Sequence, residues 1–329
     1  MTETTTSATP RTAGSGEPIL KLRAINKSFG PVHVLQDVDF EAHAGEVTAL
    51  VGDNGAGKST LVKCIGGTYS IDSGEYLFEG APVKVHDPRD AASLGIEIVY
   101  QDLALCENLD IVGNMFLGRE RVSGWGTLDE NTMERMAGET LSGLSVRTVK
   151  SLRQQVSSLS GGQRQTVAIA KSVLWNSKVV ILDEPTAALG VAQTAQVLDL
   201  VRRLADRGLA VILISHNMRD VLEVADRIVA LYLGKTAAQV QRADVTQTQI
   251  VELITAGHSG DIGLLPAANG NGNGNGNGNG SAAQVAEVLG IADGIADEPA
   301  AVADAAADAE AAAGTEETDG TDGVQGAAE

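Results

Sequence analysis

The sequence predicts an α/β fold in which helices flank a mostly parallel sheet. Two observations carry this prediction. Short, uninterrupted apolar segments at residues 47–51, 179–182 and 210–214 have the pattern of strands that are buried on both faces. Amphipathic helical patterns at 162–175 and 191–207 precede the last two of these segments. Strands that alternate with helices in this way build parallel sheets.

The first part of the folded region has a different pattern. Residues 19–29 and 32–40 alternate as two strands around the turn at Gly30 and Pro31. Two strands joined by so short a turn are antiparallel. We therefore expect an antiparallel β subdomain at the N-terminal side of the parallel sheet.

The remaining elements follow from local signals. A helix is expected at 58–65, where Gly66 and Gly67 end it. Residues 96–100 form a further strand, and 229–233 form the last one. Between 102 and 160 the strand pattern disappears and helical patterns dominate, which predicts an inserted helical subdomain.

Charge divides the chain into a body and a tail. Residues 259–329 hold 13 of the 43 acidic residues, none of the 24 Lys and Arg, and no aromatic residue. An Asn-Gly repeat runs through 269–280 as a flexible spacer. Such a segment buries too little apolar surface to offset its chain entropy. We expect a folded domain at 18–258, a disordered N-terminus at 1–17 and a disordered acidic tail at 259–329.

Composition excludes several classes of protein. The longest apolar runs are far shorter than the ~20 residues that cross a bilayer, and residues 1–17 lack the apolar core of a secretory signal. Cys64 and Cys106 form neither a disulfide framework nor a zinc motif, and they fit a reducing compartment. The body is mildly acidic, with 30 acidic and 24 basic residues, which argues against nucleic acid as a partner.

A phosphate-binding loop is the strongest chemical signal. The sequence GDNGAGKS matches G-x-x-x-x-G-K-S in full, directly after the strand at 47–51 and before a helix. The backbone of such a loop wraps phosphates, the lysine bridges the β- and γ-phosphates, and the hydroxyl binds Mg²⁺. The residues assigned to nucleotide binding here are Gly52, Asp53, Asn54, Gly55, Ala56, Gly57, Lys58, Ser59 and Thr60.

Two carboxylates follow another buried strand. The segment VVILDEP places Asp183 and Glu184 at the carboxyl end of the strand at 179–182, where open α/β sheets bind ligands. Asp183 suits a Mg²⁺ partner, and Glu184 suits a general base that activates water. Because apolar strands that end in acids are common, the assignment depends on the phosphate loop.

A second phosphate-reading segment precedes them by about 20 residues. Ser160, Gly161, Gly162 and Gln163 open the helix at 162–175, where backbone N–H groups favour an anion. A chain with one phosphate loop has no internal need for a second such helix terminus. We therefore expect this segment to read the nucleotide of a partner subunit, the alternative being an ordinary helix cap.

Three single residues complete the candidate site. His216 follows the strand at 210–214 and is expected at the γ-phosphate, whereas Gln101 follows the strand at 96–100 and is expected to contact Mg²⁺ and water. Phe29 ends the first strand and is placed to stack on adenine, with core packing as the alternative.

These motifs together resemble the ATP-binding subunits of ABC transporters over roughly residues 19–255. The family order is an A-loop aromatic at Phe29, Walker A at 52–59, a Q-loop at Gln101, a signature at 159–163, Walker B at 179–184 and a switch histidine at His216. The stretch 100–120 and the residues EPTAALG at 184–190 look more narrowly like monosaccharide importers of the ribose, xylose and fructose type.

The resemblance implies a P-loop NTPase core that hydrolyses ATP with Mg²⁺. It further implies two copies that sandwich two nucleotides, with Glu184, His216 and Gln101 as catalytic residues and Ser59, Gln101 and Asp183 at the metal. Membrane permease subunits and an extracytoplasmic sugar-binding protein are implied as separate partners, which places the protein at the cytoplasmic face of the membrane. In this family the region from Gln101 to about Met115 meets the permease.

The sequence departs from the family pattern in two ways. Many sugar-importer ATPases carry two tandem cassettes, whereas this chain has one Walker A and one signature, which suits a homodimer. Gly190 stands where the wider family usually has Asp, so the carboxylate role of that loop is in doubt. The ATPase of an exporter and a soluble ABC ATPase without transport remain the alternatives, and the sequence does not name the sugar.

Overall fold

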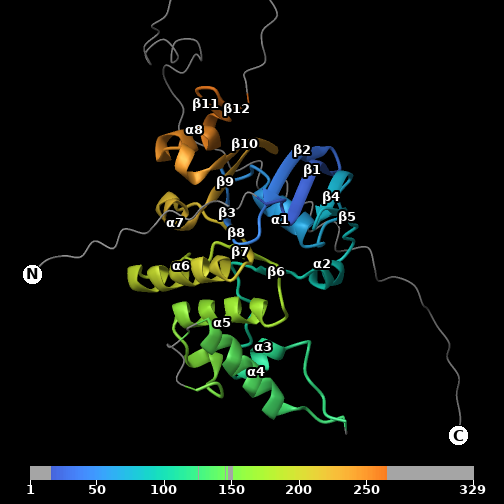
Figure 1. Ribbon diagram of the computed structural model, residues 1–329, viewed down its shortest axis with the longest axis vertical. Helices are drawn as coiled ribbons and strands as arrows, with labels where there is room; N and C mark the ends of the chain where they lie inside the picture. Colours follow the sequence, from blue (N-terminus) through green and yellow to red (C-terminus); the bar gives the residue numbers. More distant parts are fainter. Residues whose placement is uncertain (1–15, 125, 145, 147–150, 265–329) are drawn as a thin grey trace, which may run out of the picture. The chain divides into compact units, whose positions relative to one another are not determined.

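A computed structural model describes residues 16–124, 126–144, 146 and 151–264 (Figure 1). The expected disordered segments at 1–17 and 259–329 lie almost wholly outside the described residues. Two short strands, β11 (His258–Ser259) and β12 (Ile262–Gly263), pair as an antiparallel hairpin. The domain end that we expected at residue 258 therefore falls inside this hairpin.

A six-stranded sheet forms the centre of the domain, in the order β10-β9-β3-β8-β7-β6. All neighbouring pairs are parallel except β10–β9, which is antiparallel. The predicted α/β class with a mostly parallel sheet is therefore confirmed. The strands are β3 (Val47–Gly52), β6 (Ile96–Val99), β7 (Val179–Asp183), β8 (Ala210–Ile214), β9 (Arg227–Tyr232) and β10 (Lys235–Gln241).

An antiparallel sheet covers one face of the central sheet. Its order is β2-β1-β4-β5, which confirms the expected N-terminal β subdomain. Apolar residues of this sheet pack with α1 and with alternate residues of the central strands, such as Leu50 and Ile212. The elements on this face are β1 (Leu20–Phe29), β2 (Val32–Ala42), β4 (Ser73–Phe78), β5 (Ala81–Pro82), α1 (Lys58–Ile65) and α2 (Pro88–Leu94).

Helices cover the opposite face of the central sheet (Figure 1). Val47 and Leu213 point to this side, because successive residues of a strand alternate between faces. Each fully buried Val, Leu or Ile contributes about 1.5–3 kcal/mol, so this two-sided burial holds the sheet in place. The helices are α5 (Gly161–Val173), α6 (Val191–Asp206), α7 (Met218–Val224) and α8 (Gln247–Ala256).

The segment between β6 and α5 contains the expected helical subdomain. Its described helices are α3 (Ile111–Phe116) and α4 (Glu130–Gly143), with a 3-10 turn at Val156–Ser158. Asp110 and Asp129 cap the two helices by accepting hydrogen bonds from backbone N–H groups. None of the helices in the described part of the chain combines the length and the apolar character needed to span a membrane.

Several elements were not predicted, namely β4, β5, β10, β11, β12, α2, α7 and α8. For β10 the reason is clear. We expected the last strand at 229–233, but the chain turns at Leu233 and Gly234 and returns as β10. β10 has the sequence KTAAQVQ and lies at the edge of the sheet, where only Ala237 is buried among its seven residues. An edge strand with one covered face carries too few apolar residues to show a strand pattern.

Asn114 holds the start of the helical subdomain together. It is fully buried in α3. Its Oδ1 accepts from the backbone N–H of Cys106 at 2.7 Å, and its Nδ2 donates to the carbonyls of Cys106 at 2.9 Å and Asp110 at 3.0 Å. This one amide therefore fixes the loop at 106–110, which follows Gln101.

We expect Asn114→Leu to lower the free energy of unfolding by about 3 kcal/mol, because it leaves the backbone N–H of Cys106 without its partner and removes the donations to the carbonyls of Cys106 and Asp110. Urea unfolding followed by circular dichroism measures the change. Asn108→Ala, an exposed position in the same loop, is the control and should stay within about 0.5 kcal/mol of the parent. Equal stabilities of the two variants would contradict this role for Asn114.

Candidate active site

The strand order brings the predicted motifs to one edge of the central sheet. β3, β8, β7 and β6 are neighbours, and all four are parallel. Their carboxyl ends therefore lie side by side. These ends lead in turn to the phosphate loop, to His216, to Asp183 and Glu184, and to Gln101.

The phosphate loop needs its glycines. Gly55 and Gly57 have left-handed backbone angles, with φ of 78° and 99°. A Cβ on Gly57 would lie 2.8 Å from Cδ2 of Leu35, and a Cβ on Gly52 would lie 2.7 Å from the carbonyl oxygen of Leu231. No side chain caps the start of α1, so its first N–H groups suit an anion.

Lys58 crosses this loop. Its ammonium donates to the carbonyls of Gly52 and Asp53, both at 2.9 Å. Burial lowers the pKa of Lys58, although Glu184, Asp53 and Asp183 act in the opposite direction. A desolvated ammonium with nearby loop carbonyls is the group that an anionic phosphate would stabilise.

The two carboxylates after β7 differ in environment. Burial, and secondarily the charge of Glu184, raises the pKa of Asp183, whereas Lys58 opposes the shift. Glu184 has φ of 49°, a conformation that non-glycine residues rarely adopt, and its N–H donates to the carbonyl of Ile214 at 3.0 Å. Backbone strain of this kind collects at functional sites.

His216 pairs with Glu184. Its Nδ1 lies 2.7 Å from Oε2 of Glu184, and the imidazole is 76% exposed whereas the carboxylate is 16% exposed. With Nδ1 donating, the histidine orients the carboxylate and keeps Nε2 toward solvent. The sequence placed each residue at a strand end, and the structure brings the two side chains into contact.

The segment 160–163 lies apart from the phosphate loop. It begins α5, and α5 and α1 cover opposite faces of the central sheet (Figure 1). Ser160 and Gln163 form a reciprocal capping box at the start of α5. A Cβ on Gly162 would lie 3.1 Å from Cβ of Gln193, so this helix start packs on the first turn of α6.

The two remaining predicted residues, Gln101 and Phe29, are at least partly exposed. Gln101 is exposed just beyond β6. Phe29 is half-buried, with its ring 5.1 Å from that of Tyr69 in an edge-to-face arrangement and the ammonium of Lys27 5.4 Å from its centroid. Packing on Tyr69 thus accounts for part of its surface, and stacking on adenine stays a prediction.

Sequence reasoning missed three residues beside the site. Thr186, Asn217 and Asp220 form a hydrogen-bonded group in which Asp220 is only 3% exposed. No local pattern marks them, because Thr186 and Asp220 are 34 residues apart and meet only when β7 and β8 pair.

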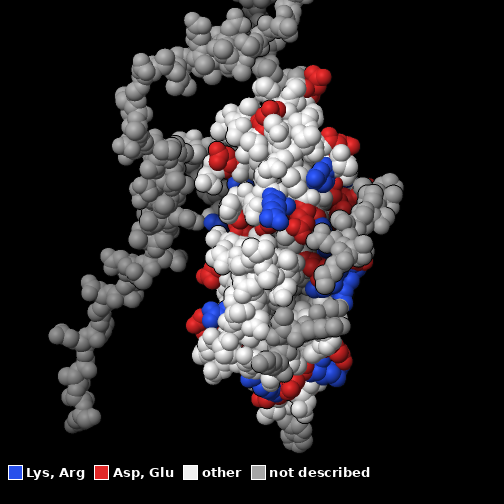
Figure 2. Space-filling view, turned by 90° about the vertical axis from the view of Figure 1, so that its left-hand side faces the viewer, with Lys and Arg blue, Asp and Glu red and all other residues white. Residues whose placement is uncertain are grey.

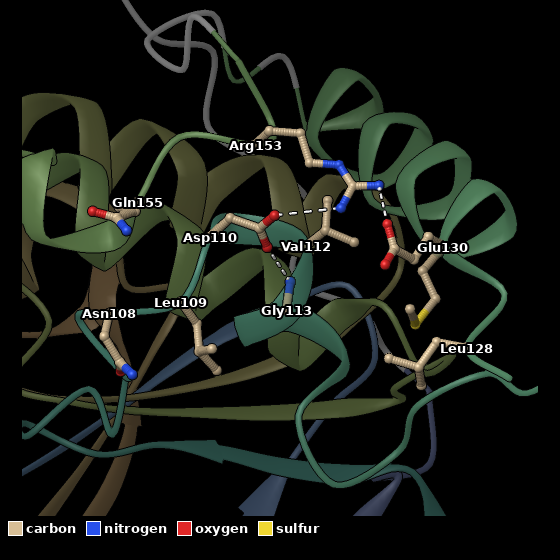
Figure 3. Close-up of a pocket in the computed structure, with 10 residues that line it drawn as sticks. Asn108, Leu109, Asp110, Val112, Gly113, Leu128, Glu130, Arg153 and Gln155 are labelled. Carbon is tan, nitrogen blue, oxygen red and sulfur yellow. Dashed lines mark hydrogen bonds and ion pairs between the residues drawn. The ribbon is translucent and has the colours of Figure 1, made fainter.

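A separate hollow of about 400 Å³ lies in the helical subdomain (Figure 3). Arg153 reaches across it between Asp110, 3.5 Å away, and Glu130, 3.1 Å away. Leu109, Leu128 and Met133 contribute apolar lining. Part of the lining of this hollow comes from residues 108–113, which belong to the segment expected to meet a permease.

Comparison with known proteins identifies the family. Residues 35–187 match the ABC transporter family. The fructose import ATP-binding protein FrcA of Rhizobium meliloti is 46% identical over 245 residues, which cover 73% of this chain and 94% of that protein. The xylose/arabinose import ATP-binding protein XylG of Sulfolobus acidocaldarius is 44% identical over 75% of this chain and 97% of that protein.

The chain belongs to the ABC transporter family, as one of its ATPases. Among solved structures, a nucleotide-free ATP-binding cassette from an ABC transporter is similar, with a TM-score of 0.62 and 25% identity over 68% of this chain and 92% of that one. CbiO1 of Clostridium perfringens, part of the transporter complex cbiONQ, has a TM-score of 0.62 at 26% identity, covering 72% and 93%. The resemblance and the fold class inferred from sequence are confirmed.

This ABC ATPase differs in length from some sugar-import relatives. It is 37% identical to the ribose import ATP-binding protein RbsA of Yersinia pestis over 74% of this chain but only 48% of that protein.

Gly190 caps α6 without a side chain, and its N–H donates to Oε1 of Gln193 at 3.3 Å. An added Cβ at Gly190 meets nothing within 4 Å, so the fold does not require glycine there.

We expect Asp183→Asn to stabilise the nucleotide-free ATPase. Because the pKa of Asp183 is raised above 3.8, the folded state binds this proton more tightly than the unfolded state. Ionised Asp183 therefore costs stability as the pH rises through the folded pKa, and the cost persists at pH 7. Removing it should raise the free energy of unfolding by about 1 kcal/mol.

Thermal unfolding between pH 4 and 8 tests this expectation, with the exposed Asp244→Asn as the control. The gain should shrink toward acid pH, and MgATP should stabilise the parent more than Asp183→Asn. A variant that is less stable than the parent at pH 7 would show that ionised Asp183 is favourable in the fold.

Proposed function

We propose that this ABC ATPase hydrolyses MgATP to drive import of a monosaccharide through a separate permease. The named functions of the fructose and xylose/arabinose relatives support import, and they favour it over the exporter and non-transport alternatives. The observation that carries the catalytic part is the Glu184–His216 pair at 2.7 Å, on the same sheet edge as the phosphate loop.

In this proposal the phosphate loop and the start of α1 bind the phosphates of ATP. The backbone N–H groups of residues 52–60 surround the phosphates, and the ammonium of Lys58 turns from its loop carbonyls to the β- and γ-phosphates. Phe29 stacks on the adenine. The positive end of α1 adds to the potential that holds the nucleotide.

The residues expected at Mg²⁺ fit that ion. Ser59, Gln101 and Asp183 supply hydroxyl, amide and carboxylate oxygens from the segments at the carboxyl ends of β3, β6 and β7, and Mg²⁺ prefers oxygen ligands. When bound, the ion neutralises charge on the β- and γ-phosphates. Burial and the charge of Glu184 raise the pKa of Asp183, and a bound cation would act in the opposite direction.

Glu184 takes the proton of the attacking water. His216 holds this carboxylate through Nδ1 and stays exposed enough to meet the γ-phosphate. A base must lie within hydrogen-bond reach of the proton that it removes, so the orientation set by His216 matters as much as charge. Gln101 positions the water from the neighbouring strand.

The second half of each site comes from another copy of the chain. Ser160, Gly161, Gly162 and Gln163 lie at the start of a helix that covers the sheet face opposite α1. A homodimer would place this helix start against the nucleotide of the partner subunit. Closure of the dimer on ATP would then move the permease, and hydrolysis would reset it.

The permease would meet the surface at 101–115 and the hollow beside it (Figure 3). An extracytoplasmic sugar-binding protein would deliver the sugar, and the ATPase would work at the cytoplasmic face of the membrane.

On the face seen in Figure 2, Lys and Arg are interspersed with Asp and Glu around a broad uncharged area. That face offers no continuous positive surface for nucleic acid.

We expect Glu184→Gln to lower kcat at least about 100-fold while ATP still binds, because the shape remains but the base is lost. Lys58→Ala should instead weaken ATP binding, because it removes the phosphate clamp. Steady-state ATPase assays, nucleotide-binding titrations and uptake of labelled fructose, xylose and ribose measure these effects. Parent-like hydrolysis by Glu184→Gln would refute the role of Glu184.

We expect Ser160→Arg to abolish hydrolysis while the monomer keeps its affinity for ATP. Mixing it with Lys58→Ala should restore about a quarter of the parent rate, because half of the randomly paired dimers are mixed and each keeps one intact site. Subunit mixing followed by ATPase assay measures the recovery. If Ser160→Arg weakened ATP binding by the monomer as much as Lys58→Ala does, the signature would act within its own chain, and this result would refute the sandwich dimer.

A further inference from the structure

A buried carboxylate that takes no part in the proposed chemistry is hydrogen-bonded to both loops that carry the catalytic pair. Asp220, in the first turn of α7, is 3% exposed. Its Oδ2 accepts from the hydroxyl of Thr186 at 2.7 Å, and its Oδ1 accepts from Nδ2 of Asn217 at 3.1 Å. A buried carboxylate is costly unless hydrogen bonds satisfy it, and here both of its oxygens are used.

The two donors come from the two loops that carry the catalytic pair. Thr186 lies two residues after Glu184 in the loop that follows β7. Asn217 comes directly after His216 in the loop that follows β8. Asp220 therefore joins these loops a second time, in addition to the contact between Glu184 and His216.

Backbone bonds carry this link to the catalytic side chains. In the first loop, Ala187 N–H donates to the carbonyl of Glu184 at 3.1 Å, so Thr186 lies within a turn that begins at Glu184. In the second, Asn217 N–H donates to Oγ of Ser215 at 3.0 Å, on the other side of His216. Each donor to Asp220 is thus part of the turn that presents its catalytic neighbour.

Glu184 needs such support because its backbone is strained. A residue at φ of 49° keeps that conformation only where the surroundings hold it. Hydrogen bonds to a carboxylate are short and strong, and a buried one is little weakened by solvent. Thr186 and Asp220 are therefore well placed to hold the turn.

We infer that Asp220 is a positioning residue that, through Thr186 and Asn217, sets the orientation of Glu184 toward His216. This inference rests on the proposed roles of Glu184 and His216. A general base that moves by about 1 Å loses up to about 100-fold in rate, whereas ATP binding by the phosphate loop is unaffected. Loss of this positioning should therefore lower kcat and leave the affinity for ATP unchanged.

Thr186→Val and Thr186→Ser form a matched pair that tests the inference. Valine keeps the shape of threonine but cannot donate to Asp220, whereas serine keeps the hydroxyl. We expect Thr186→Val to lower kcat by about 10- to 100-fold with KM for ATP changed less than about threefold, and Thr186→Ser to recover most of the rate. Thr255→Val removes a hydroxyl that bonds the carbonyl of Val251 in α8, and this control should match the parent.

Asn217→Leu removes the other donor to Asp220 and serves as the second variant. The same loss of kcat with parent-like ATP binding supports the inference, even if Thr186→Val fails to fold. If both variants fold, bind ATP and hydrolyse it at the rate of Thr255→Val, the inference is overturned.

A double-mutant cycle separates positioning from general support of the fold. If Asp220 acts on the alignment of Glu184 with His216, Thr186→Val should cost less than about threefold in kcat when His216→Ala is already present. An equal loss in both backgrounds would overturn the inference. Parent-like kcat of His216→Ala alone would instead refute the proposed role of His216, and that failure is read from a different variant.

Discussion

The parallel register of β3, β8, β7 and β6 is the constraint on which the site depends. It aligns Leu50 with Ile214, Ile214 with Asp183, and Leu182 with Val99, so four strand ends reach one edge at the same height. The proposed roles of Lys58, His216, Glu184 and Gln101 depend on this alignment. A shift of one residue in β7 would exchange its two faces and turn Asp183 away from the edge.

The same edge of the sheet holds groups whose burial or backbone conformation costs stability. A half-buried Lys58, an Asp183 with a raised pKa and a strained Glu184 lie within one small region. The apolar layers on both sides of the sheet, about 1.5–3 kcal/mol for each buried aliphatic side chain, offset these local costs. We propose that these costs preorganise the site for an anionic ligand with a bound metal ion. The anion would stabilise the charged Lys58, and the metal ion would stabilise the ionised Asp183.

Much of the fold was predictable because its central strands are buried on both faces. Residues 47–51, 179–182 and 210–214 are apolar apart from Thr48, and each is part of a strand of the central sheet. β4 and β10 escaped prediction because one side of each is exposed or polar, which leaves too few apolar residues to show a period. The motif order also sufficed to identify the family, since chemistry at the phosphates needs particular residue types at set spacings.

The sequence alone predicted the phosphate-binding loop, the two carboxylates, the helix start at Ser160 and the α/β class, because spacing and hydrophobic period are local properties of the chain. Only the tertiary structure decided that His216 contacts Glu184, that Asp220 joins their loops, and that α5 and α1 lie on opposite faces of the sheet. Those outcomes depend on strand pairing between segments about 30 residues apart or more. No local pattern encodes such a pairing, because it is the shared burial of the whole sheet that selects it.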